Sequence, residues 1–152
     1  MADLEGRFLS IRDRHPAWQG RTVAVSTYRK GGGTFGFFAS QDPRSRFFTS
    51  LGFTVPEALD DSAGGKFFGE VSAERLPLLD ADLVVWDQLT YVDGGKAAIV
   101  ADPLVAQMRS AREGRQIFLE GDLENAFAFN SVLSLPFVLD GVVPMLDAAL
   151  RK

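Results

Sequence analysis

The stretch from Val71 to Trp86, VSAERLPLLDADLVVW, restricts the possible folds more than any other part of this 152-residue chain. Its last five residues, DLVVW, form an apolar, β-branched run of the length of a central strand in a parallel sheet. The residues before this run predict a short helix, with Ser72 as its N-cap and Pro77 as a source of distortion. A strand that is buried on both faces needs helices on both sides, so the stretch predicts an α/β fold.

The rest of the chain alternates between strand and helix patterns. Further strands are expected at residues 22–26, 34–39 and 116–119, with a glycine turn at residues 31–33. Helices are expected at residues 3–14, from Asp42-Pro43, from Asp102-Pro103 and from about Leu135, where Pro144 should kink the last one. Residues 53–70 should be loop with a short edge strand at Phe67-Phe68, and residues 120–134 should be irregular. The sequence therefore predicts a three-layer α/β sandwich with a mostly parallel central sheet, in a Rossmann-like single lobe.

Composition and missing motifs exclude several classes of function. The net charge is -4 and no basic cluster is long enough to follow a phosphate backbone, which disfavours nucleic-acid binding. The absence of cysteine and the single histidine, His15, leave no thiolate or multi-histidine metal site. The chain contains no G-x-S-x-G elbow and no phosphate-binding loop. We therefore expect a domain that is not an enzyme and holds no cofactor.

Two kinds of membrane signal are also missing from the sequence. No apolar run approaches the ~20 residues of a membrane helix. The first residues, MADLEGRFLSIRDRHP, lack the apolar centre of a signal peptide.

Polar and aromatic side chains follow the ends of the expected strands. In open parallel sheets, ligands bind at the carboxyl ends of the strands, so we expect these side chains to share one rim. The candidates are Tyr28, Ser40, Arg44, Trp86, Gln88, Asn125 and Phe127. Rings, amides and a guanidinium on one rim suit a bulky, polar, partly anionic ligand.

Ordinary structural roles fit several of the same residues. Trp86 can close the core as well as contact a ligand. Arg44 fits a solvated surface charge, and Phe127 fits an edge strand that packs on the core. Glu74, near a helix N-terminus, would be stabilised by the helix dipole by about 0.3–1 kcal/mol without any function.

Five segments in order resemble a known family: HPAWQGRTVAV, FASQDPRSRFFTSLGFTVP, VSAERLPLLDADLVVW, ADPLVAQMRSAREGRQIFL and SLPFVLDGVVPMLDAALRK. They are similar to the C-terminal lobe of the helical-backbone (class III, TroA-like) substrate-binding proteins that bring iron–siderophore complexes to ABC importers. In that family, one long helix joins two α/β lobes and the ligand lies between them. The resemblance implies that residues 1–14 are the end of the connecting helix and residues 15–152 the substrate-binding lobe.

The resemblance also implies a function. The chain would be the ligand-binding lobe of an extracytoplasmic receptor, in the periplasm or on a surface lipoprotein, that captures ferric siderophore and delivers it to a permease. Glu74 matches the glutamate that docks this lobe on permease arginines, and an exposed carboxylate suits a bidentate arginine. The first lobe, the signal peptide and the lipid anchor would lie outside this chain.

The resemblance places the ligand at the strand ends, where family members hold the iron centre with arginines and aromatic rings. These positions correspond to Arg44, to residues 86–88 and to residues 125–127. Gln88 and Leu89 stand where some catecholate binders have an arginine, so catecholate, hydroxamate and mixed siderophores all stay open.

Other functions remain open from the sequence. A receptor lobe of this kind can serve another metal chelate, such as cobalamin or haem. A small flavodoxin-like nucleotide-binding or enzymatic domain would need a phosphate-cradling loop between a strand and a helix. The nearest candidate loop, Ser40-Gln41-Asp42-Pro43, lacks glycine and loses one backbone N–H to proline. A plain interaction module is the third alternative.

Overall fold

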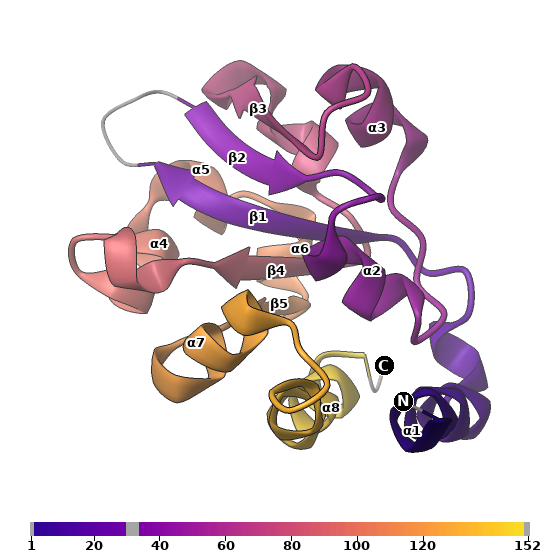
Figure 1. Ribbon diagram of the computed structural model, residues 1–152. Helices are drawn as coiled ribbons and strands as arrows, with labels where there is room; N and C mark the ends of the chain where they lie inside the picture. Colours follow the sequence, from indigo (N-terminus) through magenta and orange to yellow (C-terminus); the bar gives the residue numbers. More distant parts are fainter. Residues whose placement is uncertain (1, 30–33, 151–152) are drawn as a thin grey trace.

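A five-stranded sheet forms the middle layer of the protein, in a computed structural model that describes residues 2–29 and 34–150 (Figure 1). The strands are β1 (Val23–Arg29), β2 (Thr34–Phe38), β3 (Phe68–Ser72), β4 (Leu83–Asp87) and β5 (Gln116–Phe118), and their order in the sheet is β3-β2-β1-β4-β5. Strand β4 pairs in parallel with β1 and β5, whereas β2 pairs antiparallel with β1 and β3. Of the strands described, β2 alone is reversed, which confirms the mostly parallel sheet. The expected glycine turn at residues 31–33 lies outside the described residues.

Helices cover both faces of the sheet, as predicted for three layers (Figure 1). One face carries α1 (Ala2–Arg14), α2 (Pro43–Thr49), α7 (Gly121–Phe129) and α8 (Leu135–Ala149). The other face carries α3 (Glu57–Ala63), η2 (Ala73–Leu79), α4 (Gly95–Ala101), α5 (Pro103–Ala106) and α6 (Arg109–Arg112). Two 3-10 turns, η1 (Pro16–Trp18) and η3 (Leu89–Tyr91), connect these elements to the strands.

Strand β4 separates the two hydrophobic cores. Successive strand residues point to opposite faces, so Leu83 and Val85 enter the core beneath α2, α7 and α8. Val84 and Trp86 enter the core beneath α3, α4 and α5. All four side chains are fully buried, as expected for a central strand with helices on both sides.

Both expected Asp-Pro caps are confirmed. Asp42 accepts a hydrogen bond from the Arg44 amide at 2.9 Å, and Asp102 accepts one from the Leu104 amide at 2.9 Å. The Ser72 cap is wrong, because that side chain makes no capping hydrogen bond. The helix that follows it is the 3-10 helix η2, which accommodates the distortion expected at Pro77.

Two segments expected to be irregular contain helices. Residues 53–70 include α3, whose first turn carries the acidic residues Glu57 and Asp60 that favour a helix N-terminus. Residues 120–134 include α7, which packs on α8. A Cβ on Gly141 of α8 would lie 2.8 Å from Leu123 Cδ1, so the glycine permits this close approach. Within the described residues, no helix is long and apolar enough to cross a membrane.

Two phenylalanines of α7 test its placement, because they lie two residues apart in opposite surroundings. Phe127 is 0% exposed in the core, whereas Phe129 is 79% exposed. We expect Phe127→Ala to lower the free energy of unfolding by about 3–5 kcal/mol. We expect Phe129→Ala to change it by less than about 0.5 kcal/mol. Urea unfolding measures both values, and equal losses for the two variants would contradict this orientation of α7.

Candidate functional site

Four strands end at one edge of the sheet, which we call the carboxyl edge. Tyr28 of β1 lies there, one residue before the strand ends, and pairs with Phe35 of β2. Gln88 directly follows β4, and Asn125 is exposed on α7, which follows β5. Glu74 is exposed directly after β3. The structure therefore brings Tyr28, Gln88 and Asn125 to one edge, as the rim predicted.

The prediction that Ser40 lies on the same rim is wrong. The prediction treated β2 as parallel, but the strand is reversed and Phe38 at its end pairs with Phe68, the first residue of β3. Ser40 therefore lies toward the opposite edge of the sheet. There its hydroxyl donates to Asp60 Oδ2 at 2.7 Å and its amide donates to Asp60 Oδ1 at 2.8 Å.

The prediction that Trp86 and Phe127 contact a ligand is also wrong, because both side chains are 0% exposed. The Trp86 indole donates to Gln116 Oε1 at 2.9 Å and packs edge to face on Tyr28. Phe127 packs edge to face on Phe47, with the ring centroids 5.6 Å apart. In this arrangement neither ring can reach a ligand, so both serve the core.

Two other aromatic rings, which the prediction did not include, are exposed. Phe129, at the end of α7, is 79% exposed, and Tyr91, at the end of η3, is 83% exposed. Single exposed apolar side chains are common on protein surfaces, so these two rings are of interest because of their place beside the strand ends. The AFAF segment contained the signal for Phe129, but an extended-strand interpretation of that segment selected the wrong one of its two rings.

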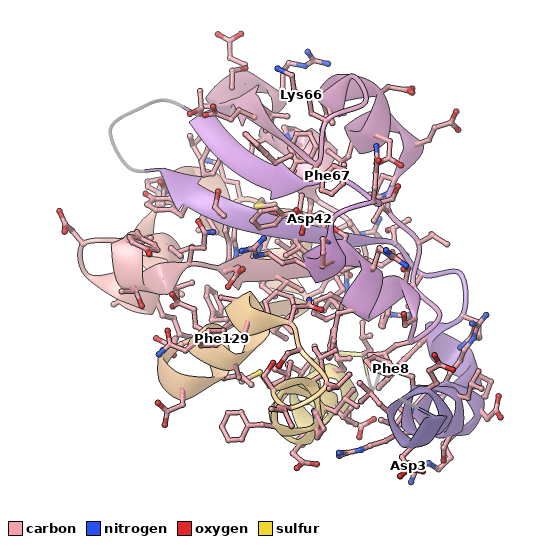
Figure 2. The ribbon with its side chains drawn as sticks, viewed as in Figure 1. Asp3, Phe8, Asp42, Lys66, Phe67 and Phe129 are labelled. Carbon is pink, nitrogen blue, oxygen red and sulfur yellow. The ribbon has the colours of Figure 1, made fainter. Side chains whose placement is uncertain are left out.

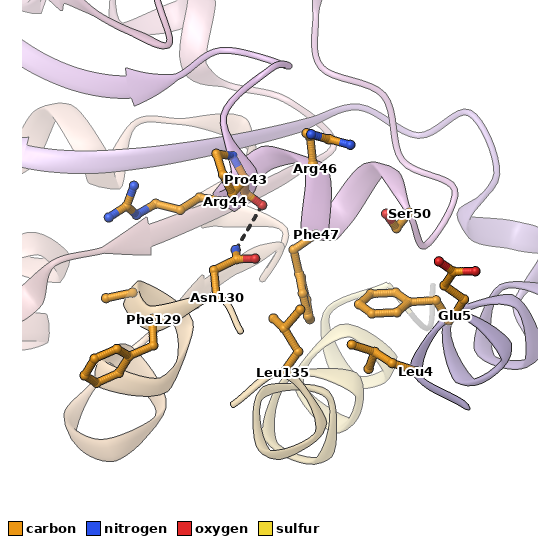
Figure 3. A pocket seen from close by; sticks show the side chains of 12 residues that line it. Leu4, Glu5, Pro43, Arg44, Arg46, Phe47, Ser50, Phe129, Asn130 and Leu135 are labelled. Carbon is orange, nitrogen blue, oxygen red and sulfur yellow. Dashed lines mark hydrogen bonds between the residues drawn. The ribbon is translucent and has the colours of Figure 1, made fainter. Parts of the chain in front are cut away.

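Arg44 reaches from the first turn of α2 toward the end of β4 (Figure 3). Its Nε lies 3.5 Å from Asp87 Oδ2, and its Nη1 lies 3.5 Å from Asp42 Oδ1. The guanidinium carbon lies 4.6 Å from the centroid of the Phe38 ring. Although the side chain is 25% exposed, its Nε is buried and makes no hydrogen bond. Arg44 is therefore a half-buried cation held by ion pairs and ring stacking, and not a fully solvated surface charge.

Asp87 is the most strongly perturbed carboxyl group beside Arg44. Burial raises the pKa of Asp87 to about 6, and the nearby Glu124 and Asp42 also raise it. The Gln88 amide and Arg44 oppose this rise in pKa. Gln88 itself has φ of 61°, in the left-handed region that a non-glycine residue rarely adopts. The chain therefore turns sharply directly after the buried carboxylate.

Glu124 of α7 is a third carboxyl group of this region and lies near Asp87. It is buried, and its Oε1 accepts a hydrogen bond from the Thr90 amide at 3.1 Å. Asp42 and Asp87 thus pair with one guanidinium and Glu124 lies near Asp87, although no group of acidic or histidine side chains in the described residues could hold a metal ion. No motif in the sequence indicated Glu124, because its burial depends on how α7 packs.

A groove of about 580 Å³ opens beside Arg44, between α1, α2 and the turn from α7 to α8 (Figure 3). Its apolar wall includes Leu4, Phe8, Phe47 and Leu135. At its other end the Asn130 amide donates to the Pro43 carbonyl at 3.1 Å and fixes the α7–α8 turn against α2. Figure 2 shows Phe129 beside this turn and on the same face as Phe8. The groove therefore combines apolar and polar walls, as sites for bulky ligands usually do.

Tyr28 contributes a hydroxyl group that is already engaged. Its OH donates to Asp102 Oδ2 at 2.5 Å. Burial and this hydrogen bond to Asp102 raise the pKa of Tyr28 to about 12. The phenol therefore stays protonated at neutral pH and ties the end of β1 to the cap of α5.

The pH dependence of stability tests the buried Asp87. Its pKa of about 6 in the folded protein exceeds the ordinary value of 3.8, so between these pH values the folded protein holds a proton that the unfolded chain releases. The contribution of Asp87 to stability is therefore highest below about pH 4 and is lost as the pH rises through about 6. The two pKa values correspond to a loss of at most about 3 kcal/mol.

We expect Asp87→Asn to remove this dependence. The free energy of unfolding of the variant minus that of the unaltered chain should increase from pH 4 to pH 7, because all other carboxyl groups titrate in both proteins. Urea unfolding at each pH measures the difference. A difference that stays constant over this range would show that the Asp87 carboxyl is not perturbed as described.

Comparisons with known proteins find the same fold over nearly the whole chain. No protein-family model and no curated protein matches the sequence. A periplasmic solute binding protein from Mycobacterium smegmatis is 30% identical, with a TM-score of 0.77 over 98% of this chain and 49% of its own. Streptococcus pneumoniae PiaA in complex with ferrichrome is 22% identical, with a TM-score of 0.78 over 99% of this chain and 51% of its own. Staphylococcus aureus FhuD2 with bound ferrioxamine B is 12% identical, with a TM-score of 0.75 over 98% and 57%.

The chain spans about half the length of these neighbours, which are solute-binding proteins and not enzymes. Nearly all of this chain aligns with them, so the correspondence covers a complete α/β unit. The resemblance found in the sequence is confirmed. The chain has the fold of a single lobe of a FhuD-like periplasmic siderophore-binding protein of ABC importers.

Proposed function

We propose that this chain is the ligand-binding lobe of an extracytoplasmic receptor that captures ferric siderophore and delivers it to the permease of an ABC importer. The observation that carries the proposal is the carboxyl edge, where Arg44 borders a groove of about 580 Å³ and Phe129 is exposed beside it. The ferrichrome and ferrioxamine B complexes of the neighbours PiaA and FhuD2 support this ligand class.

The ligand would be held by donors and rings that the structure leaves accessible. Arg44 would donate to the oxygen atoms around the iron, since a guanidinium binds oxyanions through several N–H groups. Gln88 and Asn125 would add amide hydrogen bonds, and Tyr28 would border them. Phe129 and Tyr91 would stack on the organic part of the chelate. We leave Ser40, Trp86 and Phe127 out of this site, because they lie elsewhere or are buried.

We infer that a second lobe completes the cleft and that α1 is the end of the helix that connects the two. Three contacts fix α1 to this lobe and support that role. Phe8 packs edge to face on Phe47, Arg7 pairs with Asp140 of α8, and His15 directly after α1 contacts Asp147 of α8 at 2.9 Å. A lobe that binds without its partner should hold the ligand weakly, because half of the contacts are missing.

Delivery to a permease would use Glu74. The side chain is exposed in the first turn of η2, at the same carboxyl edge as the site. A shallow recess of about 280 Å³ lies beside it, lined in part by Pro77, Leu104 and Met108. An exposed carboxylate next to an apolar recess suits an arginine whose stem packs while its guanidinium pairs. Contact with the membrane would then occur only through the permease or through an anchor outside this chain.

The nucleotide-binding alternative is disfavoured by the loop it requires. Ser40 lies toward the opposite edge of the sheet, and the polar groups of the segment from Ser40 to Pro43 already have partners. Ser40 bonds to Asp60, while Asp42 occupies the first free amide of α2. Another metal chelate, such as cobalamin or haem, remains a competitor that binding experiments can compare directly.

An amide NMR titration with gallium-loaded siderophores tests the site. We expect hydroxamate chelates to shift the signals of Arg44, Gln88, Asn125 and Phe129, because Arg44 and Phe129 line the groove and the other two follow β4 and β5 at the carboxyl edge. Cobalamin and haem, added in competition, should not reverse the shifts. Shifts confined to Ser40 and Asp60 at the opposite edge would contradict the site.

Charge reversal at Glu74 tests the docking role in the protein that contains both lobes. We expect Glu74→Arg to reduce uptake of ferric siderophore at least about tenfold, since it replaces an attractive charge pair with a repulsive one. Ligand affinity should stay within about twofold, because Glu74 lies outside the proposed groove. The matched control is Glu57→Arg, an exposed glutamate of α3. Loss of affinity in Glu74→Arg, or equal loss of uptake in both variants, would contradict docking through Glu74.

A further inference from the structure

In the described part of the chain, carboxyl groups outnumber cations around Arg44 and Asp87, and an anion-binding site would not need these carboxyl groups. Asp42, Asp87 and Glu124 are 6%, 2% and 6% exposed, and Arg44 is the cation that the described residues place within ion-pair distance of Asp42 and Asp87. Asp42 has a structural reason to be there, as the cap of α2. Glu124 has a partial one, since it accepts the Thr90 amide. Asp87 also accepts a backbone amide, that of Gln88, and pairs with Arg44, but burial still disfavours its ionised form.

We propose that Asp87, assisted by Glu124, determines the charge of the ligand that the carboxyl edge accepts, favouring neutral or cationic chelates over multiply anionic ones. The inference rests on the proposed function and deepens it, because it concerns the same site. Asp87 would act as a specificity-determining residue without touching the ligand, through the charge it leaves beside Arg44.

The ion pairs of Arg44 provide the basis for this charge selection. While its Nε faces Asp87 and its Nη1 faces Asp42, the remaining edge of the guanidinium can donate to a ligand, but the positive charge is already balanced. A neutral hydroxamate chelate offers oxygen acceptors and adds no net charge. A multiply anionic catecholate chelate would be repelled by carboxylates that are buried and therefore poorly screened by salt.

Protonation of Asp87 should weaken this discrimination. The charged groups that face Asp87 are Arg44 and Asp42 from α2 and Glu124 from α7, and the Gln88 amide donates to it. Burial raises the pKa of Asp87 to about 6, so its negative charge is largely present at pH 7.5 and largely absent at pH 5. If Asp87 only supported the fold, a change of pH would not change which ligand charge the site prefers.

The test compares two gallium-loaded chelates, a neutral tris-hydroxamate and an anionic tris-catecholate, in amide NMR titrations of this chain at pH 7.5. The measured quantity is the ratio of their dissociation constants. We expect Asp87→Asn to shift this ratio about tenfold toward the catecholate, the effect of removing one poorly screened charge near the ligand. Glu124→Gln should shift it in the same direction, because the amide oxygen can still accept the Thr90 amide. Asp93→Asn, at an exposed carboxylate after η3, is the control and should change the ratio less than about twofold.

The outcomes separate the two proposals. If both chelates bind and Asp87→Asn leaves their ratio unchanged, the charge-selection role of Asp87 is wrong and the receptor function stands. If no chelate binds to the unaltered chain or to a variant whose spectrum shows an intact fold, the receptor function fails, and the charge selection fails with it. A ratio that shifts equally in Asp87→Asn and Asp93→Asn would show that net charge alone is responsible, which also contradicts a specific role for Asp87.

Discussion

The burial of β4 on both faces is the constraint on which the rest of the structure depends. Its five residues, Leu83 to Asp87, are all buried, and they pair in parallel with β1 on one side and β5 on the other. A strand of this kind requires a helical layer on each face, and the two hydrophobic cores provide those layers. The same strand carries Asp87 to the carboxyl edge, where the ionised group meets Arg44. The element that organises the fold therefore also delivers the charge that distinguishes the site.

The general architecture could be predicted because its signals are local. The β-branched run of β4 and the two Asp-Pro caps depend on a few neighbouring residues, and the structure contains all of them. The direction of β2 could also have been inferred, since two strands joined by a connection of only a few residues pair antiparallel. That single reversed strand moved Ser40 away from the rim. Helix α7 was missed because its stability comes from packing on α8 rather than from its own sequence pattern.

The candidate site was predicted less completely than the fold, for a related reason. Sequence position places a residue near a strand end, but burial decides whether its side chain faces a ligand. Gln88 directly follows β4, and Arg44 reaches the end of β4 only through its long side chain, while Trp86 and Phe127 turn into the two cores. The carboxyl groups around Arg44 and Asp87 come from three separate elements, the cap of α2, the end of β4 and the middle of α7. No spacing in the sequence connects these three carboxyl groups.

The most direct measurement is the paramagnetic broadening that a ferric hydroxamate siderophore causes in the amide spectrum, compared with its diamagnetic gallium form. Broadening depends on distance from the iron and locates the metal without requiring tight binding. We expect the strongest broadening around Arg44, Gln88, Asn125 and Phe129 at the carboxyl edge. Broadening centred on Ser40 and Asp60, or spread evenly over the surface, would contradict ligand binding at this edge.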